Sequence, residues 1–357
     1  MEENKLKNLR KEIELIDENI LSLVNQRASL AKEIGRIKNQ YDLHIYKPER
    51  EVQLVAKLKS INQGPLGAND IDYIFKEIIS SCRALEKRPL VAFLGPYGTY
   101  SQQALNKQFG KSTEKLACSS IAEIFREVEL GNADFGIVPV ENSYEGSVNL
   151  TLDLFLQTSV PIIGELELQI EHHLINKTGK KDDVKKIYGH SQAIAQCYSW
   201  LNSHFSEIEK CELSSSGEAA RYASENKKFA AVAGDLAIQK YSLKKIYSQI
   251  QDDPNNRTRF AVIGFIETSP SGFDQTSLIL SVLNKPGAMH KLLSPLAKHS
   301  VSMNRVESRP ARTGTWEYFF HIDIAGHQKE EKVNKALVEL KDCAAFFKIL
   351  GSYPKAK

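Results

Sequence analysis

The sequence lacks the features that define membrane, disulfide-stabilised and zinc-binding proteins. No apolar run in its 357 residues approaches the length that spans a bilayer. The cysteines are odd in number and have no CxxC spacing, which predicts a reducing cytoplasm and no zinc site. They are Cys82, Cys118, Cys197, Cys211 and Cys343. The charged amino terminus leads directly into a helical pattern, so we expect no signal peptide.

The chain also lacks an excess of charge of either sign. Its 47 Lys and Arg residues nearly balance its 44 Asp and Glu residues, so the formal net charge of +3 gives no indication of a nucleic-acid partner. There is no internal repeat and no low-complexity tract. Apolar residues make up 42% of the chain, as in ordinary globular proteins. A chain of this length is expected to form two or three domains.

The first 88 residues contain helical patterns only. We expect one helix from Lys5 to Lys38, a second that begins near Pro48, and a third with Asn69 as its cap. Three helices, one of them very long, bury little apolar surface in a monomer, so this segment is expected to need a partner chain.

The pattern changes after residue 88. Residues 90–266 alternate strand-like runs with helices, which is typical of an α/β domain. The runs are Leu90–Leu94, Phe135–Val140, Pro161–Ile175, Phe229–Ala233 and Phe260–Ile266. After a polar link, residues 276–354 follow the order βαββαβ of a ferredoxin-like sandwich. Its expected elements are Ser277–Leu283, Gly287–His299, Val301–Glu307, Trp316–Ile324, Lys329–Asp342 and Phe346–Leu350.

Arg27 interrupts an apolar seam in the long helix. The seam recurs at steps of three and four through Leu6, Leu9, Ile13, Ile16, Ile20, Leu23, Leu30, Ile34 and Ile37. One interpretation is that the Arg27 head group escapes to solvent. The other is that an anion meets it, because a dry unpaired charge is strongly unfavourable. Lys38 lies on nearly the same helix face, and Arg50 and Glu51 open the second helix, which favours a small polyanionic ligand inside the bundle.

Arg10 lies 17 residues before Arg27, about 25 Å away along a helix axis. One chain cannot bring both residues to one small ligand, whereas two antiparallel copies can. We therefore predict an intertwined helical homodimer with two composite sites.

This set of residues on three helices resembles the all-helical chorismate mutase domain. Its members are Arg10, Arg27, Lys38, Arg50, Glu51 and Glu86. The resemblance implies rearrangement of chorismate to prephenate, a pericyclic step that depends on positioning and charge stabilisation. It implies that Arg27 and the second chain's Arg10 bind carboxylates. It further implies that Lys38 and Glu86 address the ether oxygen, and that Glu51 binds the ring hydroxyl.

Three positions leave questions open. A glutamate at position 86 must be protonated to donate a hydrogen bond, so we expect mutase activity to fall as pH rises and Glu86→Gln to flatten the profile. Lys47 stands where some members of the family carry aspartate, and Cys82 where some carry serine. The roles of these two side chains are therefore open.

Small polar turns occur at the ends of the predicted strands in the middle segment. They are Gly95–Ser101, Pro139–Ser143, Gly189–Ala193 and Ser214–Ser216, joined by the run Asn256–Phe260. Each alone is typical of a helix cap. Together they predict a ligand site, because α/β proteins bind ligands at strand ends and helix N-termini.

These motifs resemble prephenate dehydratase, a fold of two α/β lobes around a cleft like a type II periplasmic binding protein. The resemblance implies decarboxylating dehydration of prephenate to phenylpyruvate. Thr258 is implied as the donor to the departing hydroxyl, and Arg259 as the partner of a substrate carboxylate; a strand-edge ion pair is the alternative for Arg259. The implied substrate-binding residues are Thr99, Ser101, Glu141, Asn142, Ser143, His190, Gln192, Ser215, Arg259 and Phe260.

The C-terminal βαββαβ unit carries two motifs that resemble an ACT regulatory domain. One opens its first helix and the other, Glu-Ser-Arg-Pro, follows its second strand. The resemblance implies feedback by L-phenylalanine held between paired ACT domains, its carboxylate at a helix N-terminus. The implied effector site comprises Gly287, Ala288, Met289, Glu307, Ser308, Arg309 and Pro310.

The three resemblances are collinear, over residues 1–88, 90–266 and 276–354, in the order of bifunctional chorismate mutase/prephenate dehydratases of phenylalanine biosynthesis. They imply no cofactor, no metal, no nucleic acid and no membrane partner. The implied partners are chorismate, prephenate, L-phenylalanine and a second copy of the chain, in a homodimer or higher homo-oligomer. One alternative is a dehydratase with an inactive mutase domain. Another is a non-catalytic phenylalanine sensor, which leaves the cationic set of the first helices unexplained.

Overall fold

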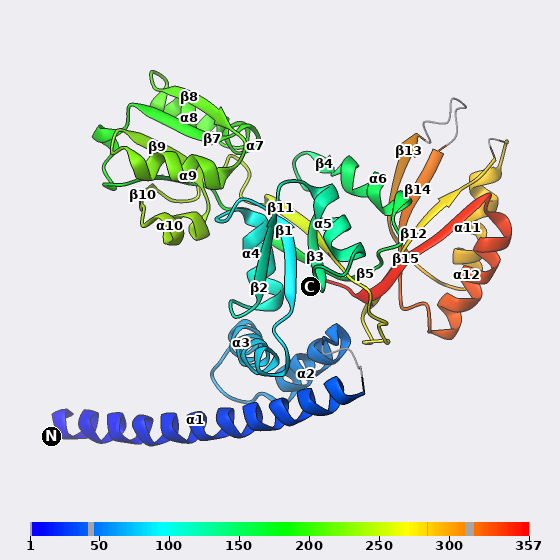
Figure 1. The fold of residues 1–357 in the computed structure, drawn as a ribbon, viewed down its shortest axis with the longest axis horizontal. Helices are drawn as coiled ribbons and strands as arrows, with labels where there is room; N and C mark the ends of the chain where they lie inside the picture. Colours follow the sequence, from blue (N-terminus) through cyan, green and yellow to red (C-terminus); the bar gives the residue numbers. More distant parts are fainter. Residues whose placement is uncertain (1, 42–45, 284, 311–317, 357) are drawn as a thin grey trace. The chain divides into compact units, whose positions relative to one another are not determined.

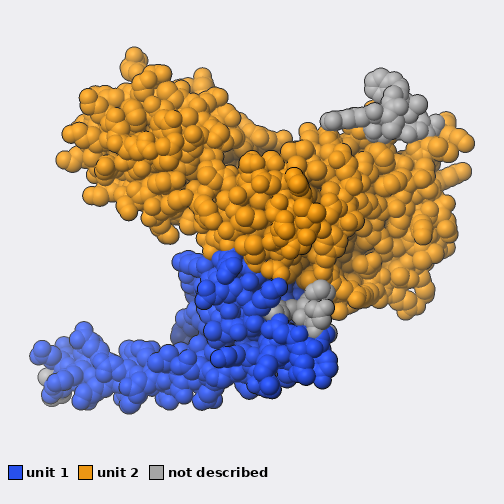
Figure 2. Space-filling view, in the orientation of Figure 1, with its two compact units in different colours: residues 1–89, 109–114 blue, residues 90–108, 115–357 orange. Residues whose placement is uncertain are grey.

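The computed structural model describes residues 2–41, 46–283, 285–310 and 318–356, which form two compact units (Figure 1). Figure 2 colours the two units separately. Residues 1–89 and 109–114 form the first, which we call the helical unit. Residues 90–108 and 115–357 form the second, which we call the mixed unit. No helix within the described ranges combines the length and the apolar character that a membrane span requires.

The helical unit contains α1 (Glu2–Gln40), α2 (Pro48–Ile61) and α3 (Ala68–Glu86). Pro48 occupies the first turn of α2 as predicted, where its missing N–H costs nothing. The prediction of Asn69 as the cap of α3 was wrong: the N-cap is Gly67, whose N–H donates to Asp70 Oδ2 at 3.1 Å.

The apolar seam of α1 is uncovered in the protomer. Figure 1 shows the N-terminal half of α1 running clear of α2 and α3. Only Ala31 and Gly35 of α1 are buried, whereas Ile13 and Ile16 are each 56% exposed. Such a long apolar stripe in water is unfavourable by roughly 25 cal/mol for each Å² that a partner could cover.

Gly35 allows α1 and α3 to approach closely. A Cβ at this position would lie 2.7 Å from the Cα of Glu86. The contact brings the last turns of the two helices together, and with them the side chains of Lys38 and Glu86.

The mixed unit begins with a lobe built on one sheet, which we call the first lobe. Its strand order is β2-β1-β3-β11-β5, with β4 paired to β3. Its elements are β1 (Leu90–Leu94), α4 (Tyr100–Phe109), β2 (Glu114–Cys118), α5 (Ile121–Glu129), β3 (Phe135–Asn142), β4 (Gly146–Ser147), α6 (Asn149–Gln157), β5 (Ile162–Gln169) and β11 (Arg257–Ile263).

A second lobe is inserted between β5 and β11. Its sheet has the order β10-β6-β9-β7-β8. Its elements are β6 (His173–Asn176), β7 (Lys186–His190), α7 (Ser191–Ala195), α8 (Tyr198–Phe205), β8 (Glu209–Leu213), α9 (Ser216–Glu225), β9 (Phe229–Ala233), α10 (Asp235–Tyr241) and β10 (Lys244–Tyr247), with a short 3-10 turn at Lys181–Asp183. The sequence pattern merged β5 and β6 into one run and did not identify β2, β7, β8 and β10, which are short or amphipathic.

The C-terminal part has the predicted βαββαβ order and an antiparallel sheet, β13-β14-β12-β15. Its elements are β12 (Asp274–Ser281), α11 (Ala288–Lys298), β13 (Met303–Pro310), β14 (Tyr318–Ala325), α12 (Glu331–Cys343) and β15 (Phe346–Pro354). The predicted strand Trp316–Ile324 begins outside the described residues and continues in β14.

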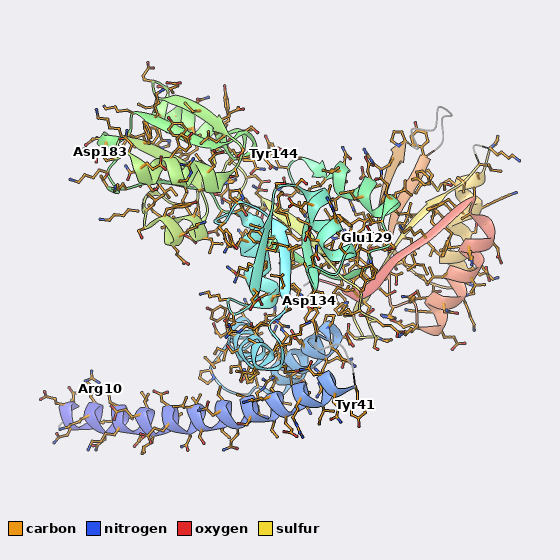
Figure 3. The ribbon with its side chains drawn as sticks, viewed as in Figure 1. Arg10, Tyr41, Glu129, Asp134, Tyr144 and Asp183 are labelled. Carbon is orange, nitrogen blue, oxygen red and sulfur yellow. The ribbon has the colours of Figure 1, made fainter. Side chains whose placement is uncertain are left out.

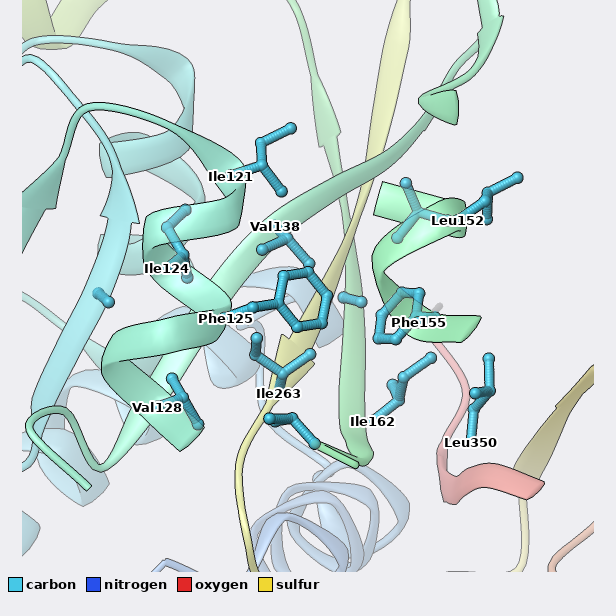
Figure 4. Close-up of a cluster of buried hydrophobic side chains, with 14 of the residues drawn as sticks. Ile121, Ile124, Phe125, Val128, Val138, Leu152, Phe155, Ile162, Ile263 and Leu350 are labelled. Carbon is cyan, nitrogen blue, oxygen red and sulfur yellow. The ribbon is translucent and has the colours of Figure 1, made fainter. Parts of the chain in front are cut away.

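One apolar core joins the first lobe to the C-terminal sheet. Phe125 and Phe155 pack edge to face with their centroids 5.1 Å apart. Leu350 and Tyr353 of β15 belong to the same buried cluster, and Figure 4 shows Leu350 beside this core. Because large side chains of both parts interdigitate, replacing Phe155 by alanine is expected to cost about 3–5 kcal/mol.

Candidate active sites

A cavity of about 360 Å³ lies between the helices of the helical unit. Five of the six residues predicted for chorismate mutase chemistry line it, from all three helices. They are Arg27, Lys38, Arg50, Glu51 and Glu86, and the two open positions, Lys47 and Cys82, lie beside them.

Ion pairs position the acidic side chains of this cavity. Lys38 Nζ lies 2.9 Å from Glu86 Oε2. Arg83 Nη1 lies 2.5 Å from Glu51 Oε1, and Arg83 Nη2 donates to the Phe109 carbonyl at 2.8 Å. Burial raises the pKa of Glu51, and the Arg83 guanidinium opposes that rise.

The sequence reasoning missed Arg83, which is only 5% exposed. The sequence contained a pattern that could have identified it. Arg83 precedes Glu86 by three residues and therefore lies on the same face of the helix. Its contacts to Glu51 and to the backbone make it the residue that anchors the acidic side of the cavity.

Arg27 does not escape to solvent. It is half-buried and lines the cavity, so an anion inside the bundle would meet it. Glu86, in turn, accepts from Lys38 in this ligand-free arrangement. Its expected role as a hydrogen-bond donor to the ether oxygen therefore stays a prediction.

Arg10 lies far from this cavity within the helical unit. Figure 3 labels Arg10 near the start of α1 and Tyr41 just beyond its end. Arg10 is exposed and is not among the residues that line the cavity. The protomer alone thus does not bring Arg10 to Arg27.

A second cavity, of about 200 Å³, lies between the two lobes of the mixed unit. We call it the cleft. Eight of the residues predicted for dehydration line it: Thr99, Ser101, Asn142, His190, Gln192, Ser215, Thr258 and Phe260. They come from strand ends and helix starts of both lobes, as the predicted α/β arrangement requires.

Local structure fixes several of these side chains. Ser215 is the N-cap of α9, and its hydroxyl accepts from the Glu218 N–H at 3.0 Å. The Thr258 hydroxyl accepts from Asn142 Nδ2 at 2.9 Å. His190 stands at the junction of β7 and α7.

The described lining of the cleft contains no lysine, arginine, aspartate or glutamate. Its histidines include His172, which is 1% exposed. Burial lowers the pKa of His172 to about 4, so this ring is neutral near pH 7. An anionic ligand in the cleft therefore meets neither lysine nor arginine among the described lining residues, but hydrogen-bond donors such as Ser101 and Ser215.

Three predicted residues do not line the cleft. Ser143 and Glu141 instead bind other groups: the Ser143 hydroxyl accepts from the Arg257 N–H at 2.9 Å, and Glu141 Oε2 lies 3.1 Å from Arg305 Nε. Residues that are adjacent in a strand alternate between its two faces, so a contiguous motif cannot direct every side chain to one cavity.

Arg259 is the third predicted residue that does not line the cleft. Its position therefore does not agree with the prediction that it binds a substrate carboxylate. Its Nε lies 2.7 Å from Glu165 Oε2, and its Nη1 lies 2.8 Å from Asp323 Oδ2 of β14. Burial alone lowers the pKa of the guanidinium, but the surrounding Tyr353, Asp323 and Glu165 raise it, so the residue stays charged. The alternative of an ion pair agrees with the structure, although the pair is buried.

The predicted effector residues lie at two places in the C-terminal part. Gly287 (φ 77°) is the N-cap of α11, a conformation that glycine adopts without strain. Glu307, Ser308 and Arg309 lie on β13. Arg309 Nη2 binds Asp153 of α6 through both oxygens, at 2.9 and 3.0 Å, and so ties β13 to the first lobe.

One cluster in the second lobe has the composition of a cation site. Glu171, His173 and Asp235 bring their ligand atoms within 4.8 Å of one another. However, Asp235 already pairs with Lys245 Nζ at 2.6 Å. His173 Nδ1 accepts from the Gln249 N–H, which puts the proton on Nε2. These contacts already engage two of the three side chains, so we interpret the cluster as an ion pair and not as a metal site.

Comparison with known protein families covers all three parts of the chain. The family model for chorismate mutase type II matches residues 9–87. The model for prephenate dehydratase matches residues 91–267, and the model for the ACT domain matches residues 276–342.

Similar proteins extend over the whole length. A bifunctional chorismate mutase/prephenate dehydratase of Pseudomonas aeruginosa is 44% identical over 361 residues, covering 99% of each chain. Another, of Aquifex aeolicus, is 44% identical over 355 residues, covering 98% of each. A solved prephenate dehydratase in complex with L-Phe, from Arthrobacter aurescens, is 30% identical with a TM-score of 0.68, over 74% of this chain and 89% of that one.

Proposed function

The chain belongs to the family of bifunctional chorismate mutase/prephenate dehydratases, and from this premise we propose which residues carry each step. The enzyme rearranges chorismate to prephenate and converts prephenate to phenylpyruvate, with an ACT domain for feedback by L-phenylalanine. We assign these parts to residues 1–88, 90–266 and 276–354.

The mutase reaction is assigned to the cavity of the helical unit. Arg27 and Arg50 bind carboxylates of chorismate, and Lys38 stabilises the charge that develops on the ether oxygen as its bond to carbon breaks. Glu51, held by Arg83, takes the ring hydroxyl. The observation that carries this proposal is the convergence of these side chains from three helices on one cavity.

The mutase site is completed by a second copy of the chain in a homodimer. Two features support this: the exposed apolar stripe on α1 and the distance of Arg10 from the cavity of its own protomer. An antiparallel pairing through α1 covers the stripe and brings Arg10 of each protomer to the cavity of the other. The oligomer in solution can be measured by light scattering.

Dehydration is assigned to the cleft of the mixed unit. Thr258 donates a hydrogen bond to the ring hydroxyl of prephenate. This hydroxyl takes up one proton from solvent and leaves as water, while the ring carboxylate leaves as carbon dioxide. The electron pair of the broken carbon–carbon bond enters the ring and makes it aromatic, so the protein need only position the substrate and assist the leaving hydroxyl. Hydrogen-bond donors at strand ends and helix starts, among them Ser101, His190 and Ser215, bind the carboxylates.

Feedback is assigned to the N-terminus of α11 and to β13. The backbone around Gly287, Ala288 and Met289 offers N–H groups to the carboxylate of L-phenylalanine, and the run from Glu307 to Pro310 forms the other wall. Contacts of β13 with the first lobe, such as Arg305 Nη2 to Ser147 Oγ at 2.7 Å, support a connection between effector and cleft. Feedback requires that the effector favour one state of this connection.

One coupled assay tests the assignment. Purified enzyme is given chorismate, and prephenate and phenylpyruvate are followed separately, with and without L-phenylalanine. We expect both products in sequence and less phenylpyruvate when the effector is present. Prephenate that accumulates without phenylpyruvate would refute the dehydratase assignment, and untouched chorismate would refute the mutase assignment.

A further inference from the structure

A short segment of later chain completes the helical unit. Residues 109–114 belong to this unit, although they follow β1 and most of α4 in the sequence. Phe109, the last residue of α4, is buried, and so is Gly110 after it. We call residues 109–114 the supporting segment, because the three helices of residues 1–88 pack with it rather than alone.

Arg83 connects the supporting segment to the cavity of the helical unit. Its Nη2 donates to the Phe109 carbonyl at 2.8 Å, and its Nη1 lies 2.5 Å from Glu51 Oε1. A guanidinium is planar and presents its N–H groups in a fixed fork, so the two contacts are geometrically linked. The direction of the Glu51 carboxylate is therefore tied to the position of a backbone carbonyl in the supporting segment.

Two aromatic rings hold the guanidinium in place. Arg83 Cζ lies 5.0 Å from the ring centroid of Tyr46 and 5.6 Å from that of Phe109. The centroids of these two rings are 5.1 Å apart, and both rings are buried with Arg83. Cation–π contacts are stronger where water is excluded, so the supporting segment restrains Arg83 through a side chain as well as through its backbone.

The Phe109 carbonyl is a suitable anchor for a cation. The last carbonyls of a helix lack an intrahelical donor and carry partial negative charge. This carbonyl also accepts from the Ser80 hydroxyl at 2.6 Å and from the Thr113 hydroxyl at 2.9 Å. Donors from α3 and from the supporting segment itself thus fix the oxygen that Arg83 binds.

Gly110 allows the supporting segment to lie against α3. Its φ is 82°, and a Cβ at this position would lie 1.8 Å from Ser80 Oγ. A side chain here would therefore push the segment away from α3 and move the Phe109 carbonyl with it.

We propose that the supporting segment positions the mutase site, because it holds Arg83 and Arg83 in turn holds the Glu51 carboxylate. Arg83 is then a positioning residue that acts through Glu51. Rearrangement of chorismate depends on chain that belongs, by sequence, to the part assigned to dehydration, since α4 also supplies Ser101 to the cleft. The inference rests on the proposed mutase function.

The substitution Arg83→Met removes both polar contacts and keeps an apolar stem. We expect kcat/KM for chorismate to fall about 30-fold, equivalent to about 2 kcal/mol for the loss of a hydrogen bond between charged groups. Turnover of prephenate by the same preparation should stay unchanged. The matched control is Arg88→Met, the same substitution at an exposed position of the helical unit, which should keep the wild-type kcat/KM.

A double-mutant cycle distinguishes positioning from a general structural role. If Arg83 acts through Glu51, adding Arg83→Met to Glu51→Ala should lower kcat/KM by less than about threefold further. Two effects that multiply in full overturn the proposal, as does a kcat/KM within twofold of wild type in folded Arg83→Met. Thermal melting reports folding, and Arg83→Gln, with about a tenfold fall expected, replaces a variant that does not fold.

The role of the supporting segment is tested by Gly110→Ala, which should lower kcat/KM for chorismate about tenfold. Its matched control is Gly131→Ala, where φ is also positive, at 73°, but a Cβ would have no atom within 4 Å. If Gly110→Ala does not fold, Phe109→Leu takes its place, with about a fivefold fall expected. A value within twofold of wild type in the folded variant overturns the proposal. A wild-type enzyme that leaves chorismate untouched overturns the proposed mutase function itself.

Discussion

The cavity of the helical unit is lined by Arg27, Lys38, Lys47, Arg50 and Arg83, whereas no described residue around the cleft is a lysine, an arginine or a carboxylate. On the assignment proposed above, the two pockets nevertheless handle the same compound, since prephenate is the product of one reaction and the substrate of the other. The proposal therefore has a doubly negative molecule bound by cations in one pocket and by hydrogen-bond donors other than lysine and arginine in the other.

The chemistry of the two steps accounts for this difference. In the rearrangement, charge develops on the breaking ether bond, so fixed cations stabilise the transition state more than the ground state. In the dehydration, a carboxylate loses its charge as it leaves as carbon dioxide. A cation on that carboxylate would stabilise the ground state instead and would slow the step. On the proposed assignment, a neutral donor such as Thr258 binds the substrate with less of that penalty.

The largest effects are expected from one substitution in each pocket. Thr258→Ala should lower phenylpyruvate formation by at least about 100-fold, because it removes the donor to the leaving hydroxyl, and should spare the mutase. Lys38→Ala should lower the mutase rate by about 100- to 1,000-fold and spare the dehydratase. Separate assays on chorismate and on prephenate measure both. Loss of both activities in either variant would point to misfolding instead of the separate sites proposed here.

The next prediction tests whether the charged pocket is shared between protomers. Arg10→Ala and Arg27→Ala should each abolish most mutase activity. After the two variants are unfolded and refolded together, half of the dimers are mixed, and each mixed dimer has one site with both arginines. The mixture should therefore recover about a quarter of the wild-type mutase activity. Absence of recovery, with dimers present by light scattering, would contradict the composite site.

A lysine introduced into the cleft tests whether a cation there slows the dehydration step. We expect Gln192→Lys, on α7, to lower the KM for prephenate and also to lower kcat about tenfold, since a 1.4 kcal/mol preference for the ground state corresponds to that factor. Steady-state kinetics with prephenate separates the two constants. An unchanged or higher kcat would show that the absence of cations has another cause.

The smallest predicted effect concerns stability in acid. Burial lowers the pKa of His172 from 6.5 to about 4, so below pH 6.5 the unfolded chain binds a proton that the folded protein does not. The free energy of unfolding should therefore fall as pH decreases from about 6.5 to 4, by up to about 3 kcal/mol for this group. Burial also lowers the pKa of His321 to about 4.

Thermal melting between pH 4 and 7 measures the acid effect. His172→Gln should weaken the pH dependence of the mixed unit, and the double variant with His321→Gln should weaken it further. The charged cavity of the helical unit contains no histidine among its described lining residues. A wild-type melting temperature that stays constant over this range would contradict the assignment of a neutral His172.

The sequence predicted the site residues best on helices, because residues at helical spacing lie on one face and reach the same cavity. Arg27 and Lys38 share one face of α1, and that spacing alone placed both in one cavity. The same rule could have found Arg83, one turn before Glu86. The spacing also predicted that Arg10 and Arg27 lie too far apart on one helix to reach the same ligand. Within the protomer, Arg10 does lie apart from the cavity that Arg27 lines.

Reasoning from contiguous motifs was less reliable on strands. Asn142 and Thr258 line the cleft, while their neighbours Glu141 and Arg259 face the C-terminal sheet, because side chains alternate along a strand. The contacts of Gln196 with Asn256 and His172 could not be predicted in this way, since both residues are distant from it in the sequence. Only the folded chain shows which of its amide atoms remain unpaired.

The alternation along β11 has a consequence for regulation. Thr258 and Arg259 are consecutive in one rigid strand, yet one serves the cleft and the other is clamped by Asp323 of β14. Any tilt of the C-terminal sheet that moves the Arg259 guanidinium is therefore expected to shift the Thr258 hydroxyl as well, through the rigid strand that carries both. A small displacement of the C-terminal sheet would thus be enough to change the position of the Thr258 hydroxyl in the cleft.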